Sequence, residues 1–335
     1  MREPAFWWRA PGLLAALLAP LGALYGAVAA RRMARVGRRA RVPVICIGNL
    51  TLGGAGKTPA AIAVARMLQA AGERPAFLTR GYGGRLAGPI AVLATHTAAE
   101  VGDEPLLLAR VAPTIVARDR VAGARAVPAE TTVIVMDDGF HNPSLAKDIA
   151  AVVIDGRRGI GNGKVFPAGP LRAPLAAQLD RHPALIVIGE AGASAHEVIA
   201  AARRRGLFVL TGAFVPDPAA VAALAGRRVL AFAGIGDPDK FYATLRAAGI
   251  AVAEQRGFAD HHVFTAAEAA DLIADADARG LALVTTEKDH ARMTGHPALA
   301  TLAARSATLP VTVALDEAEG LGALVADLLH ARLFG

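Results

Sequence analysis

Residues 42–58 read VPVICIGNLTLGGAGKT, and this stretch decides the fold. The apolar run Val42–Ile47 is short and partly β-branched, which predicts a buried strand. Gly48 to Gly56 form a turn-rich loop, and residues 58–71 predict a helix that tolerates Pro59 in its first turn. A strand, a glycine-rich loop and a helix in this order are the setting of a phosphate-binding loop, or P-loop.

The loop carries the residue types that phosphate binding requires. Glycines let backbone N–H groups turn towards phosphate oxygens, and the helix N-terminus favours their negative charge. We expect Lys57 to reach the β- and γ-phosphates and Thr58 to bind Mg²⁺. The first position of the G-x-x-x-x-G-K-[ST] pattern is threonine here, and Gly53 and Gly54 restore the freedom to turn two residues later. An ordinary glycine-rich turn is the alternative. The candidate nucleotide-binding residues are Thr51, Leu52, Gly53, Gly54, Ala55, Gly56, Lys57 and Thr58.

A hydrophobic strand further along the chain ends in two acids. The run Thr131–Met136 is followed by Asp137 and Asp138. In P-loop proteins a carboxylate at such a strand end holds Mg²⁺ or its water, so both aspartates are candidate metal residues. The alternative is a solvated Asp-Asp-Gly turn. A guanine-binding N/T-K-x-D pattern is not matched by Thr286-Glu287-Lys288-Asp289, so ATP is preferred to GTP.

The rest of the chain alternates short apolar strands with helical stretches, which predicts an α/β fold with a mostly parallel sheet and flanking helices. The pattern restarts near residues 215–226, so we expect a second, smaller α/β unit. Strand Val311–Leu315 and a closing helix over Glu317–Leu333 are expected in that unit. We divide the chain into an N-terminal segment, a P-loop domain and a smaller C-terminal domain, at residues 1–41, 42–220 and 221–335.

Charge is distributed very unevenly along the chain. The net charge is +7, and residues 1–41 alone hold eight arginines and one acid. The remaining 28 basic and 28 acidic residues cancel, so the body has no basic surface for nucleic acid. A hydrophobic content of 54% excludes a disordered chain. The single cysteine, Cys46, excludes an internal disulfide and is expected in the core.

The N-terminal segment contains 19 uncharged residues, Gly12 to Ala30, interrupted by Pro20. A cleaved signal peptide is disfavoured because an arginine cluster follows the run. A transmembrane helix is barely long enough for a core of about 30 Å. An interfacial helix is favoured, because both tryptophans precede the run and the arginines suit anionic headgroups. A buried helix of a soluble fold with a basic tail is the remaining alternative.

Short motifs follow one another along the chain: IGNLT (47–51), GGAGKTP (53–59), TRGYG (79–83), VGDEP (101–105), DDGF (137–140), GNG (161–163), PAGPLR (167–172), GIGDP (234–238), DHH (260–262) and TEKD (286–289). In this order they resemble the tetraacyldisaccharide 4'-kinase family of lipid A biosynthesis. The family usually reads D-D-G-F-Q-H, whereas His141-Asn142 follow Phe140 here. The role of the family's histidine at position 142 is therefore open, and His141, at the neighbouring position, is a candidate to replace it.

The resemblance implies transfer of the ATP γ-phosphoryl group, with Mg²⁺, to the 4'-hydroxyl of tetraacyl glucosamine disaccharide 1-phosphate, giving lipid IVA. It implies Asp103 as the base, supported by a second-unit histidine, with His261 preferred over His262. Lys57 joins them as a catalytic residue. A helix cap is the alternative role for Asp103. Lys288 and Asp289 are interpreted as a surface ion pair. Candidate substrate contacts are Arg80, Tyr82, Glu104 and Arg172.

The same resemblance implies a location at the cytoplasmic face of the inner membrane of a Gram-negative bacterium, peripheral or monotopic. The expected partners are the lipid substrate and the membrane surface, with no nucleic acid and no obligate protein partner. A soluble P-loop ATPase or switch protein acting on a protein partner is the main alternative. A membrane-bound nucleotide sensor would keep Lys57 and Thr58 but would not need Asp103.

Overall fold

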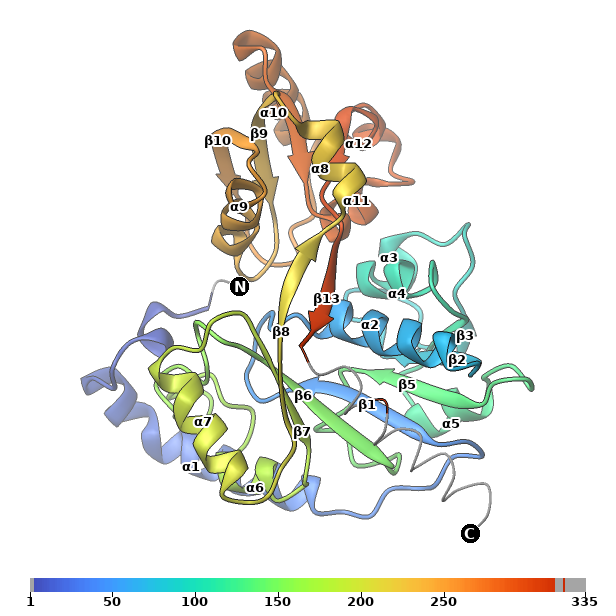
Figure 1. Cartoon of the computed structure of the whole chain (residues 1–335), viewed down its shortest axis with the longest axis vertical. Helices are drawn as coiled ribbons and strands as arrows, with labels where there is room; N and C mark the ends of the chain where they lie inside the picture. The colour runs from blue at the N-terminus through green and yellow to red at the C-terminus, as the bar shows by residue number, and fades with distance from the viewer. Residues whose placement is uncertain (1–2, 317–321, 323–335) are drawn as a thin grey trace.

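The computed structural model describes residues 3–316 and 322. In this part of the chain a large sheet has the strand order β13-β8-β7-β6-β1-β5-β2-β4-β3 (Figure 1). Its strands are β1 (Val44–Asn49), β2 (Pro75–Thr79), β3 (Ile90–Ala91), β4 (Thr114–Val116), β5 (Val133–Asp137), β6 (Ile149–Asp155), β7 (Ala184–Ile188), β8 (Val209–Pro216) and β13 (Val311–Leu315).

Strand β1 lies in the interior of this sheet. It pairs in parallel with β5 on one side and β6 on the other, and all of its residues are buried. A parallel strand covered on both faces needs a continuous apolar run, which explains the sequence before the glycine-rich loop. The pairing sets Ile47 opposite Asp137, so the loop after β1 and the acids after β5 lie at the same edge.

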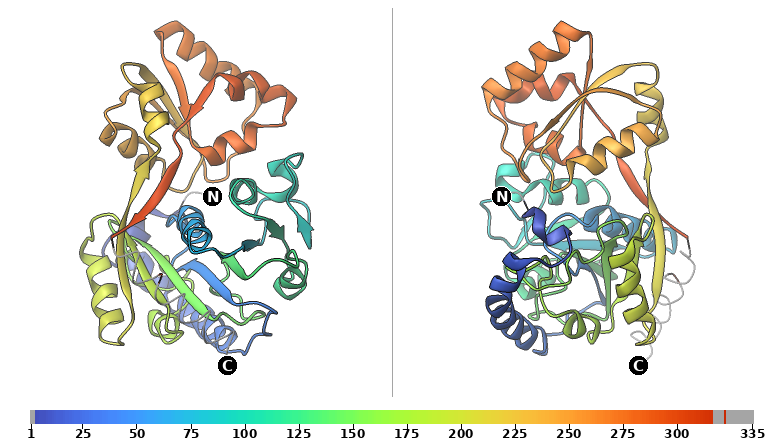
Figure 2. Two further views of the ribbon diagram at one scale, coloured as in Figure 1. Left: turned by 45° about the vertical axis from the view of Figure 1, so that its right-hand side comes forward. Right: turned by 90° about the vertical axis from the view of Figure 1, so that its left-hand side faces the viewer.

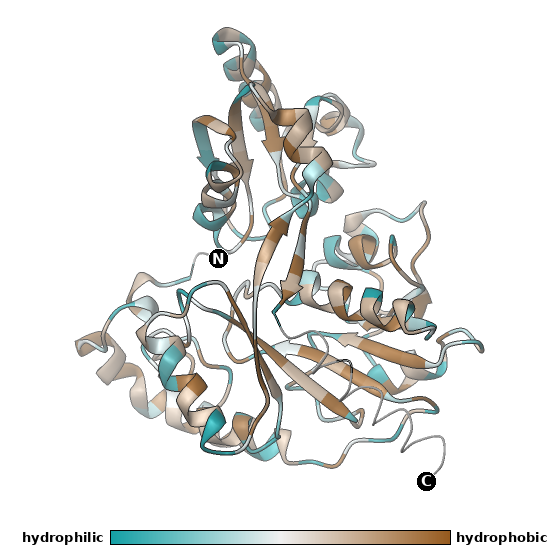
Figure 3. Cartoon of the chain, in the orientation of Figure 1, coloured by the Kyte–Doolittle hydropathy of each residue, from teal (hydrophilic) through white to brown (hydrophobic). Residues whose placement is uncertain are grey.

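Helices cover both faces of the large sheet, whose strands are coloured mainly as hydrophobic in Figure 3. One core contains residues of α2 (Lys57–Ala70) and α4 (Asp103–Leu108). The opposite core contains residues of α5 (Arg120–Arg125), α6 (Leu175–Leu179) and α7 (Ala193–Arg203), and the end of α1 (Leu13–Met33). The short elements η1 (Ala5–Trp8) and α3 (Ala98–Val101) complete this unit.

A second, smaller sheet has the order β10-β9-β11-β12, with parallel pairing throughout. The prediction of a mostly parallel sheet, a smaller α/β unit and an apolar N-terminal helix is confirmed. The elements of the smaller unit are α8 (Pro218–Leu224), β9 (Arg228–Ala233), α9 (Pro238–Ala247), β10 (Ala251–Gly257), α10 (Ala266–Arg279), β11 (Ala282–Thr285), α11 (Glu287–Met293), η2 (Pro297–Leu299), α12 (Ala300–Arg305) and β12 (Ser306–Thr308).

The strand Val311–Leu315 is expected in the smaller unit, and this expectation is wrong. As β13 it pairs antiparallel with β8 at the edge of the large sheet. Figures 1 and 2 show the two strands side by side, rising from the large sheet towards the smaller unit. A local apolar pattern predicts a strand but does not identify its partner. The predicted helix over Glu317–Leu333 lies outside the described residues, apart from Gly322, and the division at 41/42 and 220/221 stays a prediction.

Helix α1 docks on the body along one narrow stripe. Gly22 faces the backbone oxygen of Val165, and Gly26 faces the ring of Pro174. Most other side chains of the helix, including those of Leu13, Leu14 and Leu17, are exposed. By length and composition the helix is apolar enough to cross a membrane, with a mean hydropathy of 2.0. A docked helix with uncovered apolar surface is consistent with membrane association.

We predict that Gly26→Leu separates α1 from the body. A Cβ atom at position 26 would lie 3.2 Å from Pro174 Cγ, so a leucine must displace the helix. Overpacking of this kind costs about 1–3 kcal/mol. Thermal unfolding and limited proteolysis of residues 9–40 measure the effect. Ala27→Leu, at an exposed position, is the matched control; equal stability and equal cleavage of the two variants would contradict the packing.

Candidate active site

The phosphate loop connects β1 to the N-terminus of α2. Gly53 and Gly56 have φ angles of 96° and 90°, a region that favours glycine. The side chain of Asn49 donates a hydrogen bond of 3.2 Å to the backbone oxygen of Gly53. The first N–H groups of a helix have no partner within it, so the start of α2 is suited to bind an anion.

Asp137 meets the phosphate loop because β5 lies beside β1. The hydroxyl of Thr58 donates to Asp137 Oδ2 at 3.4 Å. The other oxygen, Oδ1, is buried and has no hydrogen-bond partner among the residues that the structure describes. Burial, together with the negative charges of Glu104 and Asp138, raises the pKa of Asp137 to about 7. A buried carboxylate with a free oxygen at this place is suited to a divalent cation.

Asp138 lies in a different electrostatic environment. Its backbone φ is 52°, and its carboxylate contacts Lys57 Nζ at 4.0 Å and Arg172 Nη1 at 3.2 Å. Burial opposes the charge, but Lys57 and Arg172 outweigh it and lower the pKa of Asp138 to about 2. Arg172 also donates from Nε to the backbone oxygen of Thr51 at 3.0 Å. Arg172, which the sequence predicts to contact the substrate, therefore binds the phosphate loop and Asp138.

Asp103 lies where the two units meet. It begins α4, is only 3% exposed, and accepts a hydrogen bond at Oδ1 from the backbone of Glu104. Its Oδ2 atom faces the smaller unit, 3.6 Å from His261 Nδ1 and 3.1 Å from Arg292 Nη1. Burial opposes ionisation, but His261, Lys288 and Arg292 outweigh it, and the pKa of Asp103 falls to about 2.

The two adjacent histidines have different partners. His261, with φ of 56°, lies beside Asp103 and its ring centroid is 4.9 Å from that of Tyr82. His262 bonds to Glu268 at 3.0 Å and stacks on Phe258. The structure therefore places His261 beside the predicted base. Its contact with Asp103 raises the pKa of the His261 imidazole.

Helix α11 contributes residues that the sequence reasoning missed. Lys288 Nζ lies 2.5 Å from Glu104 Oε1, across the gap between the units. Asp289 is fully buried and binds the backbone N–H of Gly234 and the side chain of Arg292. The interpretation of Lys288 and Asp289 as a surface ion pair is therefore wrong. The available signal was the spacing of Lys288 and Arg292, which places two cations on one helix face.

These residues surround a cleft of about 640 Å³ lined by both units. Arg80 and the 63% exposed Tyr82 line it, whereas Asp103 and Asp137 are buried and are not among its lining residues. His141 also lines it and bonds to Gln178, and burial lowers its pKa to about 4. The predicted residues that line it are Leu52, Gly53, Gly54, Gly56, Lys57, Thr58, Arg80, Tyr82, Glu104, Asp138, Arg172 and His261.

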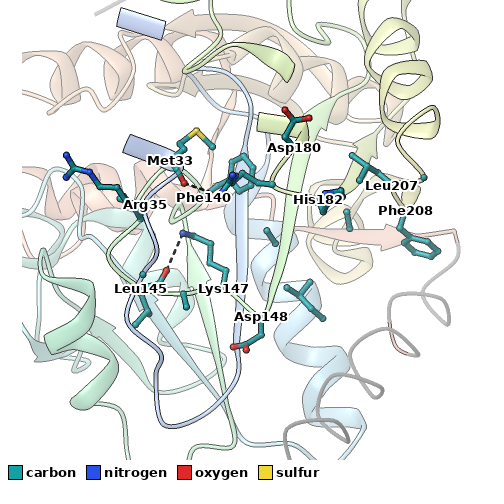
Figure 4. A pocket seen from close by; sticks show the side chains of 18 residues that line it. Met33, Arg35, Phe140, Leu145, Lys147, Asp148, Asp180, His182, Leu207 and Phe208 are labelled. Atoms are coloured by element: carbon teal, nitrogen blue, oxygen red, sulfur yellow. Dashed lines mark hydrogen bonds between the residues drawn. The ribbon is translucent and has the colours of Figure 1, made fainter. Parts of the chain in front are cut away.

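A second cavity, of about 620 Å³, lies near the end of α1 (Figure 4). Its lining includes Met33, Arg35 and residues at the starts of β6 and β7. Lys147 points across it and donates to the backbone oxygen of Leu145. None of the predicted site residues lines this cavity.

A glycine loop opening α2, paired aspartates on the neighbouring strand and a buried carboxylate–histidine pair converge on one cleft. This arrangement defines a P-loop phosphotransferase. The family model for tetraacyldisaccharide-1-P 4'-kinase, LpxK, matches residues 14–330. The chain therefore belongs to this family of lipid A biosynthesis enzymes, and the alternatives of a switch protein or a nucleotide sensor fall away.

Individual members of the family match this chain over nearly its whole length. The tetraacyldisaccharide 4'-kinase of Methylobacterium sp. (strain 4-46) is 58% identical and that of Nitrobacter winogradskyi 55%. The matches cover 99% and 98% of this chain, and 99% and 97% of the relatives. A crystal structure of the "apo" form of LpxK from Aquifex aeolicus in complex with ATP superposes with a TM-score of 0.73. It is 26% identical, and the match covers 95% of this chain and 100% of that one.

The contact between Asp103 and His261 predicts a pH-dependent stability. The pKa of His261 is raised above 6.5, so the contact stabilises the fold fully below pH 6.5 and is lost as pH rises through the raised value. The pKa of Asp103 is lowered from 3.8 to about 2, so the contact is lost on the acid side only below pH 3.8. We expect His261→Gln to lower Tm by roughly 2 °C at pH 5.5 and by less at pH 9. His262→Gln is the comparison, and a His261→Gln effect that does not change with pH would refute the assignment.

Proposed function

We propose that this chain transfers the γ-phosphoryl group of ATP to the 4'-hydroxyl of tetraacyl glucosamine disaccharide 1-phosphate, giving lipid IVA. The observation that carries the proposal is one cleft lined by the phosphate loop, Asp138 and His261, with the buried carboxylates of Asp137 and Asp103 in contact with lining residues. Membership of the kinase family supports the same reaction.

ATP would bind with its phosphates against the loop and the start of α2. Lys57 is largely buried beside this loop, and its ammonium contacts Asp138. This position allows it to bind the phosphate oxygens of ATP. The relative from Aquifex aeolicus, crystallised with ATP, supports this ligand.

The residues at the β5 edge fit Mg²⁺. This ion is held in nucleotide sites by one or two carboxylates, a hydroxyl, phosphate oxygens and water. Asp137 offers an unpaired buried oxygen, and Thr58 lies next to it. Asp138 already forms ion pairs with Lys57 and Arg172. We therefore assign Asp137 and Thr58 as the residues that would hold the ion directly, and Asp138 as a residue that would act next to them. When bound, the ion neutralises charge on the β- and γ-phosphates.

Asp103 would accept the proton of the sugar hydroxyl as the new O–P bond forms and the bond to the ADP oxygen breaks. The carboxylate is ionised at neutral pH because its pKa is about 2, and His261 helps to orient it. Lys57 would stabilise the charge that develops on the transferred group. Arg80 and Tyr82 line the cleft and remain available to contact the disaccharide, whereas Glu104 is engaged by Lys288.

The enzyme would work at the cytoplasmic face of the inner membrane, with α1 in the interface. The stripe that contains Gly22 and Gly26 holds the helix against the body, so the helix cannot cross the bilayer without leaving this contact. Its exposed leucines face away from the docked stripe, and arginines follow at its end. Apolar burial and attraction to anionic lipid together would bring the cleft to its lipid substrate.

We predict that Asp103→Asn loses transfer but keeps ATP binding. Removing a general base lowers kcat by about 10²–10⁴-fold. Asp103 is not among the residues that line the cleft, so we expect the substitution to leave ATP binding intact. The assay combines labelled ATP with the tetraacyl disaccharide 1-phosphate in detergent micelles, and nucleotide binding is measured separately. Absence of lipid labelling by the wild type would refute the kinase. Wild-type turnover by Asp103→Asn would refute only the base.

Membrane partition should depend on the exposed face of α1. The double variant Leu17→Asp/Leu24→Asp places charge on two exposed positions. We expect binding to anionic vesicles to fall by at least about tenfold, since burying one leucine contributes roughly 1.5–3 kcal/mol. Vesicle cosedimentation measures this. Val263→Asp, at an exposed position of the smaller unit, is the control. Equal binding by both variants would place the membrane contact elsewhere.

A further inference from the structure

Helix α11 presents two cations to two consecutive carboxylates of the other unit. Lys288 and Arg292 are four residues apart and therefore share one face of the helix. Lys288 meets Glu104 and Arg292 meets Asp103, at the start of α4. The helix belongs to the smaller unit and the carboxylates to the larger one.

Arg292 is anchored on its own unit by one end of its guanidinium. Nη2 donates to Asp289 Oδ1 at 2.5 Å and to the backbone oxygen of Gly234 at 2.9 Å. Asp289 is fixed in turn by the N–H of Gly234 and by the hydroxyl of Thr286. The side chain is 9% exposed, so its direction is set by these contacts.

The other end of the same guanidinium reaches Asp103. Nη1 lies 3.1 Å from Asp103 Oδ2 as an ion pair, and among the described residues neither of these two buried atoms has a hydrogen-bond partner. The planar fork of the Arg292 guanidinium therefore contacts Asp289 on one side and Asp103 on the other. A guanidinium fixes the geometry of two such contacts, which a flexible lysine ammonium does not. The remaining charged groups near Asp103 are Glu104 on α4, Asp260 and His261 on the loop before α10, and Lys288 and Asp289 on α11.

We propose that Arg292 is a positioning residue that sets the orientation of Asp103 across the gap between the two units. The inference rests on the proposed role of Asp103 as the base. The carboxylate is then held correctly only while α11 and α4 are in contact. Arg292 also lines the cleft, and we assign its effect on the reaction to its contact with Asp103.

Arg292→Met and Arg292→Lys test the proposal, with Arg305→Met as the matched control. Arg305 pairs with Asp277 on the surface of the same unit, away from the cleft. We expect Arg292→Met to lower kcat by about 100-fold with little change in the KM for ATP, because a displaced base costs a factor of this size. Arg305→Met should behave like the wild type.

The pH profile separates positioning from a purely structural role. In Arg292→Met the buried Asp103 loses a neighbouring cation, so its pKa rises. The pH profile of kcat should then show an acid limb, a loss of rate at low pH that begins at a higher pH than in the wild type. Arg292→Lys keeps the charge but not the fork. It should therefore lose part of kcat without the acid limb, and it remains informative if Arg292→Met does not fold.

The decisive measurement adds Arg292→Met to Asp103→Asn. If Arg292 acts through Asp103, the double variant turns over no more slowly than Asp103→Asn alone. A further loss in the double variant, or unchanged kcat in both single Arg292 variants, overturns the proposal. Neither result bears on the proposed kinase reaction, which wild-type labelling of the lipid tests independently.

Discussion

The parallel pairing of β1 with β5 is the constraint on which the site depends. Parallel neighbours bring their carboxyl ends to one edge, so the loop after β1 meets the acids after β5. The hydrogen bond between Thr58 and Asp137 is the direct result. The pairing also keeps both strands buried between two helical layers, which accounts for their continuous apolar sequences. Fold stability and phosphate chemistry therefore rest on the same residues.

Charge at the site is balanced between the two units. Asp103 is buried in the larger unit, and three groups that stabilise its ionised form, His261, Lys288 and Arg292, come from the smaller one. Asp138, by contrast, is neutralised within the larger unit by Lys57 and Arg172. A buried carboxylate without its partner is costly. Contact between the units is thus favoured by the same carboxylate that we assign to proton transfer.

Much of the fold could be predicted from local sequence. The predicted strand Val311–Leu315 has the bounds of β13, and the predicted strands Val42–Ile47 and Thr131–Met136 lie within two residues of β1 and β5, because short apolar runs between turn residues define a strand. Long-range partners could not be predicted, as the misplaced strand β13 shows. The same limit applies to the site. Arg292 belongs to no nucleotide motif, and only tertiary contact brings it to Asp103. The positive φ of His261 and the different partners of the two histidines, Asp103 for His261 and Glu268 for His262, are features of the folded chain that the local sequence does not reveal.

The neighbouring strands β8 and β13 have a topological consequence. The chain leaves the large sheet through β8 and returns to it through β13, and the N–H of Asp217 bonds to the backbone oxygen of Pro310 at the base of the smaller unit. The smaller unit is therefore an insertion with adjoining ends. Both of its covalent connections run through one two-stranded ribbon, β8 and β13. Twisting of that ribbon would therefore rotate the whole insertion relative to the large sheet. Such a rotation would shift α11, the helix that contacts Asp103 and Glu104.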